Sequence, residues 1–296
     1  MSDTLIRALS ASGGIRVLTC SVSGLAREIC LLQQASATVS VALGRGLAAG
    51  ALLGALLKPG QRTALKFEGN GPMCKMIIEA EWDGAVRGCV GDPTAESEPK
   101  NGRWNVPGLL GHAGFLTVTR DLGLGGEPYH GMVQLRTSEI GADLAYYLTD
   151  SEQVPSAVGL SASLNEGSGV SLCGGFLVQA LPKPDTAEID GMMARIAEMP
   201  PLSALLQEGG AKAIMDRLFD GMVYNLLETR DAFFRCGCGR EKVERALLTL
   251  GPYEINDMRD KEHGADVTCE FCRQRYRFDE AELEALAARS RASAGA

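Results

Sequence analysis

Two pairs of closely spaced cysteines near the C-terminal end constrain this chain more than any other sequence feature. Cys236 and Cys238 form a C-x-C pair, Cys269 and Cys272 form a C-x-x-C pair, and 30 residues separate the two pairs. Cysteine pairs at two separated points are how a chain delivers four thiolates to one tetrahedral zinc ion. The sequence therefore predicts a zinc site with four cysteine ligands.

The single-residue spacing of the first pair indicates a redox property. Gly237 and Gly239 suit a tight turn that would aim both sulfurs at one point. A C-x-C disulfide closes a small, strained ring, and strained disulfides are the labile, regulatory ones. Oxidation would also remove the folding energy that zinc supplies, about 10–16 kcal/mol in small zinc domains. The site is therefore a candidate redox switch. Four small buried hydrophobic side chains would be the alternative, but the neighbours Gly237, Gly239 and Arg240 are not typical of a core.

Composition indicates a globular protein and disfavours nucleic-acid binding. The chain has 296 residues, enough for two or three domains, and 45% of them are hydrophobic. Its formal net charge of −8 argues against a protein whose affinity depends on neutralising phosphates. Residues 233–296 carry 11 Lys+Arg against 12 Asp+Glu, so the cysteine region is not basic either. We expect no nucleic-acid partner.

The N-terminus has no basic-then-apolar signal pattern, which favours a cytoplasmic protein with reduced thiols. Residues 39–57 are apolar enough to resemble a membrane span, with Gly46, Gly50 and Gly54 at four-residue spacing. Arg45 lies inside this stretch, and the remainder is too short to span comfortably. We therefore expect a buried core helix with a small-residue contact face, and no membrane partner.

Residues 1–181 show runs of strands with helices grouped between them. The pattern predicts strands at 15–20, 63–71, 76–82, 85–90, 115–120, 131–135 and 175–181, and helices from 24, from 39 and over 140–149. Asp83-Gly84 is a strong hairpin signal between two of these strands. This arrangement predicts an α+β core domain.

Residues 182–232 are predicted to form a helical linker. Its start is indicated by Pro182-Lys183-Pro184, which breaks the preceding pattern of strands. The helical pattern runs over 186–227, with interruptions at Pro200-Pro201 and at 208–210. The linker holds half of the chain's ten methionines: Met192, Met193, Met199, Met215 and Met222. Methionine makes adaptable apolar surfaces that accept many partners, although it also fills cores between helices.

Residues 233–296 are predicted to form a small zinc-binding domain. A helix with one apolar face follows the first cysteine pair, and residues 281–288 form a last short helix. After the second pair, Arg273, Arg275 and Arg277 alternate with Gln274, Tyr276 and Phe278, as on a strand with one solvated face. Arginines beside aromatic residues also suit a zinc-ribbon nucleic-acid binder, which is the runner-up function.

The other candidate chemistry is weak. Five cysteines without partner spacing are predicted to be buried thiols: Cys20, Cys30, Cys74, Cys89 and Cys173. His263 lies between the cysteine pairs, but four sulfurs already complete a zinc shell. A thiol oxidoreductase would place Cys269 at a helix N-terminus, whereas a predicted strand flanks it. We find no nucleophile elbow, phosphate loop or paired carboxylates, and predict no catalytic residue and no enzyme.

Several segments spread over the chain are together highly specific. They are Asp3-Thr4-Leu5-Ile6-Arg7-Ala8, Ala42-Leu43-Gly44-Arg45-Gly46, Asn70-Gly71-Pro72, residues 143–148, 151–157 and 174–179, Glu244-Arg245-Ala246-Leu247, and residues 267–272. Through them the chain resembles, almost end to end, the redox-regulated thirty-three-kilodalton heat-shock chaperonin family of bacteria. Cys89 stands where the family often has tyrosine, which leaves its redox role open.

The resemblance implies an inactive reduced state in which Cys236, Cys238, Cys269 and Cys272 hold one zinc ion. It implies that oxidation joins Cys236 with Cys238 and Cys269 with Cys272, releases zinc, and unfolds the C-terminal part and the linker. The active form would be a homodimer that holds unfolding client proteins without ATP. Because its ring is larger and less strained, Cys269–Cys272 is predicted to close first.

Overall fold

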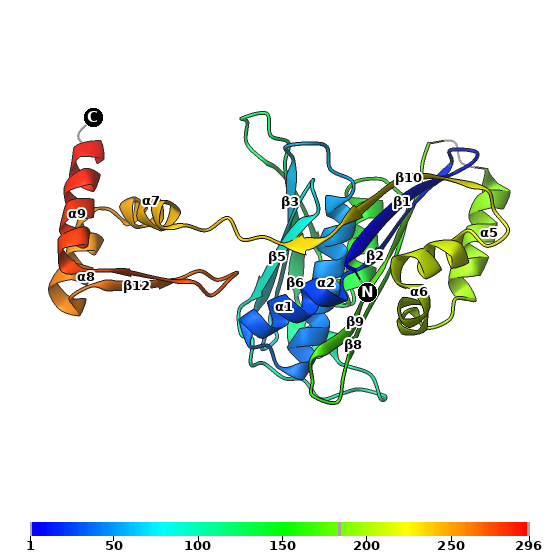
Figure 1. The fold of residues 1–296 in the computed structure, drawn as a ribbon, viewed down its shortest axis with the longest axis horizontal. Coiled ribbons are helices and arrows are strands. Elements are labelled where there is room, and N and C mark those ends of the chain that lie inside the picture. The colour runs from blue at the N-terminus through cyan, green and yellow to red at the C-terminus, as the bar shows by residue number, and fades with distance from the viewer. Residues whose placement is uncertain (1, 183–184, 295–296) are drawn as a thin grey trace. The chain divides into compact units, whose positions relative to one another are not determined.

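The computed structural model describes residues 2–182 and 185–294 and divides the chain into two compact units, Met1–Arg235 and Cys236–Ala296 (Figure 1). Lys183 and Pro184, at the predicted start of the linker, lie outside the described residues. Helices and strands are mixed in both units, which confirms the predicted α+β class.

The first unit contains two sheets. Its strands are β1 (Thr4–Ser10), β2 (Ile15–Ser21), β3 (Arg62–Gly69), β4 (Lys75–Glu81), β5 (Ala85–Val90), β6 (Gly114–Asp121), β7 (Tyr129–Gln134), β8 (Ser156–Leu164), β9 (Val170–Ala180), β10 (Tyr224–Asp231) and β11 (Phe233–Phe234). The five-stranded sheet has the order β10-β1-β2-β9-β8, and the six-stranded sheet has the order β11-β5-β4-β3-β6-β7. The β4–β5 hairpin turns at Asp83-Gly84, as predicted.

Six helices complete the described part of this unit: α1 (Ser23–Gln33), α2 (Ala37–Gly54), α3 (Val106–Leu110), α4 (Ile140–Asp150), α5 (Thr186–Ala197) and α6 (Leu202–Leu218). Helix α2 is long and apolar enough to cross a membrane, but 89% of it is buried inside the protein. Its glycines allow this burial. A Cβ on Gly46 or Gly50 would lie 2.8 Å or less from Met76 or Ile78 of β4. The predicted small-residue contact face is therefore the face that meets the six-stranded sheet.

The five-stranded sheet is apolar on both faces. Leu18 and Leu177 point into the core that contains α2, while Val17 and Val178 point into a second apolar cluster formed with α5 and α6. Figure 1 shows α2 and α6 on opposite sides of this sheet. The linker helices are thus part of the first unit's packing.

The predicted helical pattern over 186–227 is wrong at its C-terminal end. Helix α6 is interrupted at Gly209 and Gly210, as expected, and Gly210 has a φ of 62° that favours glycine. The chain then leaves the helix, and Tyr224–Asp231 forms β10, an edge strand antiparallel to β1. Gly221, with a φ of 71°, lies in the turn between them. Tertiary pairing with β1 overrides the local helical pattern here.

The second unit is small. It comprises α7 (Arg240–Leu250), α8 (Pro252–Glu262), β12 (Ala265–Thr268), β13 (Arg275–Phe278) and α9 (Glu280–Ala294). Helix α7 and strand β13 match the prediction, α9 is longer than the predicted 281–288 helix, and α8 and β12 were not predicted. Its buried apolar side chains are Leu247, Ile255, Ala265, Phe278, Leu283, Leu286 and Ala287.

Candidate metal centre

Two short segments of the second unit carry the four cysteines. Cys236 and Cys238 lie in the extended segment that leads into α7, and Cys269 and Cys272 lie in the turn between β12 and β13. Backbone hydrogen bonds close this turn: the Cys269 amide donates to the Gln274 carbonyl, and the Arg273 amide donates to the Cys269 carbonyl, both at 2.9 Å. The β12–β13 ladder, in which Thr268 faces Arg275, fixes the two ends of the turn.

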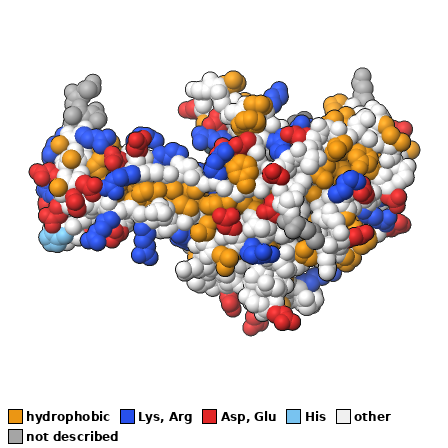
Figure 2. All heavy atoms as spheres, in the orientation of Figure 1, with side chains coloured by type: hydrophobic (Ala, Val, Ile, Leu, Met, Phe, Trp, Pro, Cys, Tyr) orange, Lys and Arg blue, Asp and Glu red, His pale blue; other side chains and the backbone are white. Residues whose placement is uncertain are grey.

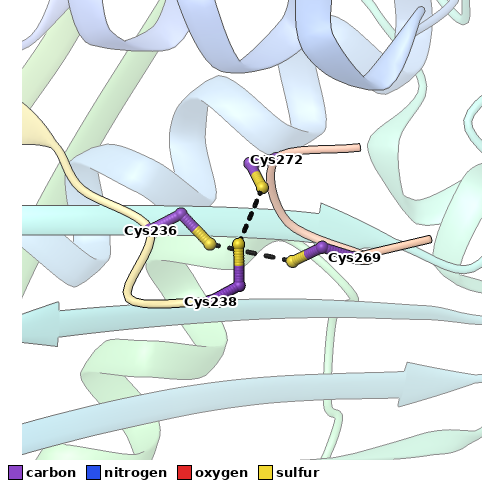
Figure 3. A group of neighbouring side chains, drawn as sticks. All are labelled: Cys236, Cys238, Cys269 and Cys272. Carbon is purple, nitrogen blue, oxygen red and sulfur yellow. Dashed lines mark hydrogen bonds between the residues drawn. The ribbon is translucent and has the colours of Figure 1, made fainter. Parts of the chain in front are cut away.

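The structure brings the four sulfurs together. Cys236 Sγ lies 3.7 Å from Cys269 Sγ, Cys238 Sγ lies 3.2 Å from Cys272 Sγ, and all four lie within 4.8 Å of one another (Figure 3). Four sulfurs at the usual Zn–S distance of about 2.3 Å stand about 3.8 Å apart at the corners of a tetrahedron. The cluster therefore has the donor set and the size of a four-thiolate zinc site.

A bound metal would change the ionisation of these thiols. Burial raises the pKa of Cys272 to about 12, and hydrogen bonds with Cys238, Cys236 and Cys269 add to this increase, against the lowering effect of the Gln274 amide. The Cys272 thiol therefore resists ionisation beside the other three sulfurs. A divalent metal would remove that penalty, since its ligands are thiolates.

Groups around the cluster orient its sulfurs. The Tyr276 hydroxyl donates to Cys238 Sγ at 3.1 Å, and this bond is the main reason that the pKa of Tyr276 rises to about 12. Lys242 Nζ donates to the carbonyl oxygen of Gly237. Such outer-shell contacts hold ligands in place for a metal.

The predicted glycine turn at the first cysteine pair is not formed. Gly239 has a φ of −175°, so it is extended, and it precedes the first turn of α7. Gly237 is not among the residues with positive φ. The left-handed residue of the site is Arg273, with a φ of 59°, in the turn of the second pair. The first pair therefore reaches the cluster from an extended segment and the second from a turn.

The remaining predicted side chains lie elsewhere. Cys20, Cys30, Cys89 and Cys173 are buried, as expected, and burial raises the pKa of Cys20 and of Cys30 to about 12. Cys74 was predicted to be buried but is exposed, because it lies in a tight turn with a φ of 61°. His263 is outside the cluster, and its Nδ1 lies 2.9 Å from Glu280 Oε1.

The aromatic residues that suggested nucleic-acid binding point inward. Phe278 is 1% exposed and lies beneath Arg240, whose guanidinium carbon is 4.3 Å from the ring centroid. Tyr276 is engaged with Cys238, while Arg275 and Arg277 are exposed. On the face of the second unit seen in Figure 2, acidic and basic side chains are interspersed. The alternation thus produces one packed face and one solvated face.

One arrangement near the site was missed by the sequence analysis. Arg235, directly before Cys236, donates to Glu81 at 2.6 Å and to Asp83 at 2.7 Å, at the end of the β4–β5 hairpin. Phe233 and Phe234 pair in parallel with β5 just before it. No sequence spacing connects position 235 with positions 81 and 83, because only the fold brings these segments together.

Comparisons with known proteins agree with one another over most of the chain. The family described as Hsp33 protein matches residues 3–279. The 33 kDa chaperonin of Pelobacter propionicus is 67% identical over 97% of this chain and 94% of its own length. The 33 kDa chaperonin of Geobacter sulfurreducens is 48% identical over 97% of this chain and 95% of its own length. The crystal structure of the 33 kDa chaperonin from Thermotoga maritima superposes with a TM-score of 0.90 at 33% identity, covering 99% of this chain and 100% of that one.

Proposed function

Because the chain belongs to the Hsp33 family of chaperones, we propose that it is an ATP-independent holdase controlled by its own cysteines. In this proposal the reduced, zinc-bound protein is inactive, and oxidation makes it bind unfolding proteins. The observation that carries the proposal is the cluster of four sulfurs within 4.8 Å of one another, in a unit with a very small apolar core.

We assign Cys236, Cys238, Cys269 and Cys272 as the ligands of one zinc ion. Zinc would neutralise the clustered thiolates and hold the segment before α7 against the β12–β13 turn. The apolar core described in the second unit is small, so the metal would contribute a large part of that unit's stability. The zinc is structural in this assignment, because four protein ligands leave no open position for catalysis.

Oxidation of the four thiolates to two disulfides would transfer four electrons to the oxidant and remove every ligand from the metal. We propose the pairs Cys236–Cys238 and Cys269–Cys272, following the family resemblance. The second is expected to close first, because the C-x-C ring is the more strained. Peptide mass mapping of partly oxidised protein tests this order, and finding Cys236–Cys238 alone would refute it.

We propose three functional regions: a core over 1–181, a hinge segment over 182–232 and a switch domain over 233–296. After loss of zinc, unfolding of the switch domain would weaken the hinge segment and expose apolar side chains to clients. The hinge already exposes several, since Val223 is 76% and Leu226 58% exposed. The oxidised form is proposed to act as a cytoplasmic homodimer on unfolding client proteins.

An aggregation assay tests this function. Reduced zinc-loaded protein should leave a heat-unfolded client to aggregate, whereas peroxide-treated protein should suppress the aggregation. Cys74→Ser serves as the matched control, because Cys74 is exposed but lies outside the cluster. A Cys269→Ser variant should bind zinc weakly and show partial activity without oxidant. If peroxide-treated protein protects no client, the proposal is wrong.

The alternatives have separate outcomes in this experiment. A zinc-ribbon nucleic-acid binder would show RNA or DNA binding that falls steeply with salt, and no protection of clients. A thiol oxidoreductase would reduce insulin, and its first cysteine would stand at a helix N-terminus. Cys269 instead lies in the turn that follows strand β12. Neither alternative gains a specific observation from the structure.

A further inference from the structure

Helix α5, the first helix of the hinge segment, depends on a methionine for its attachment to the sheet. Met192 is its one buried residue and is 1% exposed. It belongs to the apolar cluster that contains Ile15 and Val178 of the five-stranded sheet. Ile189 and Ile196 are only partly buried beside it. Loss of apolar contact at position 192 would therefore remove the most deeply buried side chain of the helix.

A cavity lies at the same place. It has a volume of about 250 Å³ and is lined by Ile15, Ala157, Val178, Ile189, Met192 and Met193, among others. Met193 is 50% exposed, so the cavity wall reaches the solvent beside the buried Met192. Small oxidants therefore have access to Met193 directly, and to Met192 through a loosely packed region.

The lining offers little to a new polar group. Its surface is almost entirely apolar. The Ser156 hydroxyl donates to the Val154 carbonyl at 2.7 Å and accepts from Gln179, and the Thr149 hydroxyl accepts from the Ser156 amide at 3.2 Å. A polar atom placed on the side chain of Met192 would therefore find few hydrogen-bond partners on this lining, which is costly in a buried position.

Polar contacts elsewhere on α5 cannot replace this anchor. Asp185 caps the helix by accepting from the Ala187 amide at 2.9 Å, and Arg195 donates to the Asp220 carbonyl at 2.7 Å. Glu188 accepts from the Ser12 hydroxyl. These are exposed contacts, in which water competes for the same groups.

We propose that Met192 and Met193 form an oxidation site that detaches α5 from the sheet independently of the cysteines. A thioether lone pair attacks one oxygen of hydrogen peroxide, and the O–O bond breaks. The proton on the transferred oxygen passes to the second oxygen, which leaves as water. Sulfur loses two electrons and gains one oxygen, which gives methionine sulfoxide. The polar sulfoxide disfavours the apolar site, so α5 opens. Methionine sulfoxide reductases would reverse the change.

This site would give the hinge segment an oxidant response of its own. The proposal that oxidation detaches α5 does not depend on whether the protein is a chaperone. The expected consequence for client binding does rest on the proposed function. The two can be separated, because the cysteines can be returned to the zinc-bound state while the sulfoxides remain. Thiols reduce disulfides by exchange, and methionine sulfoxide is repaired by dedicated reductases.

The experiment uses the full-length zinc-loaded protein. It is treated with excess hydrogen peroxide, then with a thiol reductant and zinc, and examined by peptide mass mapping and hydrogen exchange. We expect one added oxygen on Met192 or Met193 and exchange over residues 186–197 that is faster by about tenfold or more, as for an unsatisfied buried polar group. Zinc content and exchange over the second unit should equal those of untreated protein.

Three variants make the result decisive. Met192→Leu with Met193→Leu keeps the volume and should keep slow exchange after peroxide. Met192→Gln places a polar group there without oxidant and should speed exchange over α5. Met132→Leu is the control, because Met132 is 62% exposed on β7 and its loss should change nothing in α5.

The inference is overturned by unmodified Met192 and Met193 in protein whose Met132 is oxidised. It is equally overturned by sulfoxide at these positions with unchanged exchange, or by the same acceleration in the double leucine variant. Failure of the proposed function would appear elsewhere, as oxidised, zinc-free protein that protects no client.

Discussion

The two units of this protein are stabilised in different ways. In the first unit, a buried α2 lies between two sheets, and one of these sheets is covered on both faces by apolar clusters. In the second unit, one small apolar cluster around Phe278 lies beside four partly exposed cysteines. Packing suffices for the first, whereas a domain of the second's size usually needs a metal or disulfides. In the proposed function, this difference makes the second unit the part that responds to loss of zinc.

The largest expected effect separates the two units directly. Cys238→Ser should weaken zinc binding, because only three of the four thiolate ligands remain. The second unit should then lose much of the folding energy that structural zinc supplies, about 10–16 kcal/mol in small domains. We expect the second unit to lose protection from hydrogen exchange and the first unit to keep it. Cys74→Ser should bind one zinc per chain like the wild type. A folded second unit in zinc-free Cys238→Ser protein would break the comparison.

Removing one buried phenylalanine ring from each unit should affect zinc affinity in the second unit but not in the first. Phe278→Ala and Phe67→Ala each remove a fully buried ring, at a cost of about 3–5 kcal/mol. In the second unit we expect this loss to weaken zinc binding by about 100-fold or more, because folding and metal binding are coupled there. Phe67→Ala should lower the thermal midpoint of the first unit and leave zinc affinity unchanged. Chelator competition measures the affinities, and equal weakening in both variants would contradict the coupling.

A smaller effect is expected where α2 meets β4. In Gly50→Ala the added Cβ would lie 2.4 Å from Cγ2 of Ile78, so the core must shift, at about 1–3 kcal/mol. Gly126→Ala is the matched control, because nothing lies within 4 Å of the added atom. Urea unfolding should show a loss for the first variant and none for the second. Zinc affinity should be the same in both variants. A change in zinc affinity would mean that the stability of the first unit is coupled to metal binding in the second.

The smallest effect concerns Arg235, which holds the end of the first unit against its hairpin. Burial would raise the pKa of Asp83, but hydrogen bonds from Arg235 outweigh it and leave the pKa below the ordinary value of 3.8. A lowered folded-state pKa stabilises the protein above the unfolded value, and this stabilisation is lost as pH falls through the folded pKa. Asp83→Asn should cost up to about 1 kcal/mol at pH 7, as for other exposed pairs.

Thermal unfolding at a series of pH values checks this prediction. The difference between wild type and Asp83→Asn should be constant from neutral pH down to about pH 4 and should shrink below it. If the stability difference between wild type and Asp83→Asn does not depend on pH, it arises from packing of the side chain and not from its charge.

Sequence patterns predicted features whose cause is local. The glycine spacing at 46, 50 and 54 indicated the buried α2, and Asp83-Gly84 indicated the β4–β5 turn. The cysteine spacing located the cluster, because four thiols in two pairs have few other structural uses. The structure and the comparisons confirm the α+β class and the chaperone family.

Features that depend on distant contacts were not predicted. Residues 224–227 follow a helical pattern but form an edge strand, because β1 offers them a partner. The ion pairs of Arg235 with Glu81 and Asp83 join segments about 150 positions apart. The hydrogen bond from Tyr276 to Cys238 depends on how the β12–β13 hairpin folds back. Strand β8 alternates weakly and is defined by its pairing with β9.

The central claim is that the four cysteines hold a metal and that the second unit is folded only while they do. It is tested most directly by measuring zinc content and hydrogen exchange together while the reduced protein is titrated with peroxide. We predict one zinc per chain at the start, and loss of zinc in proportion to loss of protection over residues 236–294, with α2 protected throughout. Reduced protein that is free of zinc but fully protected over those residues would contradict the account.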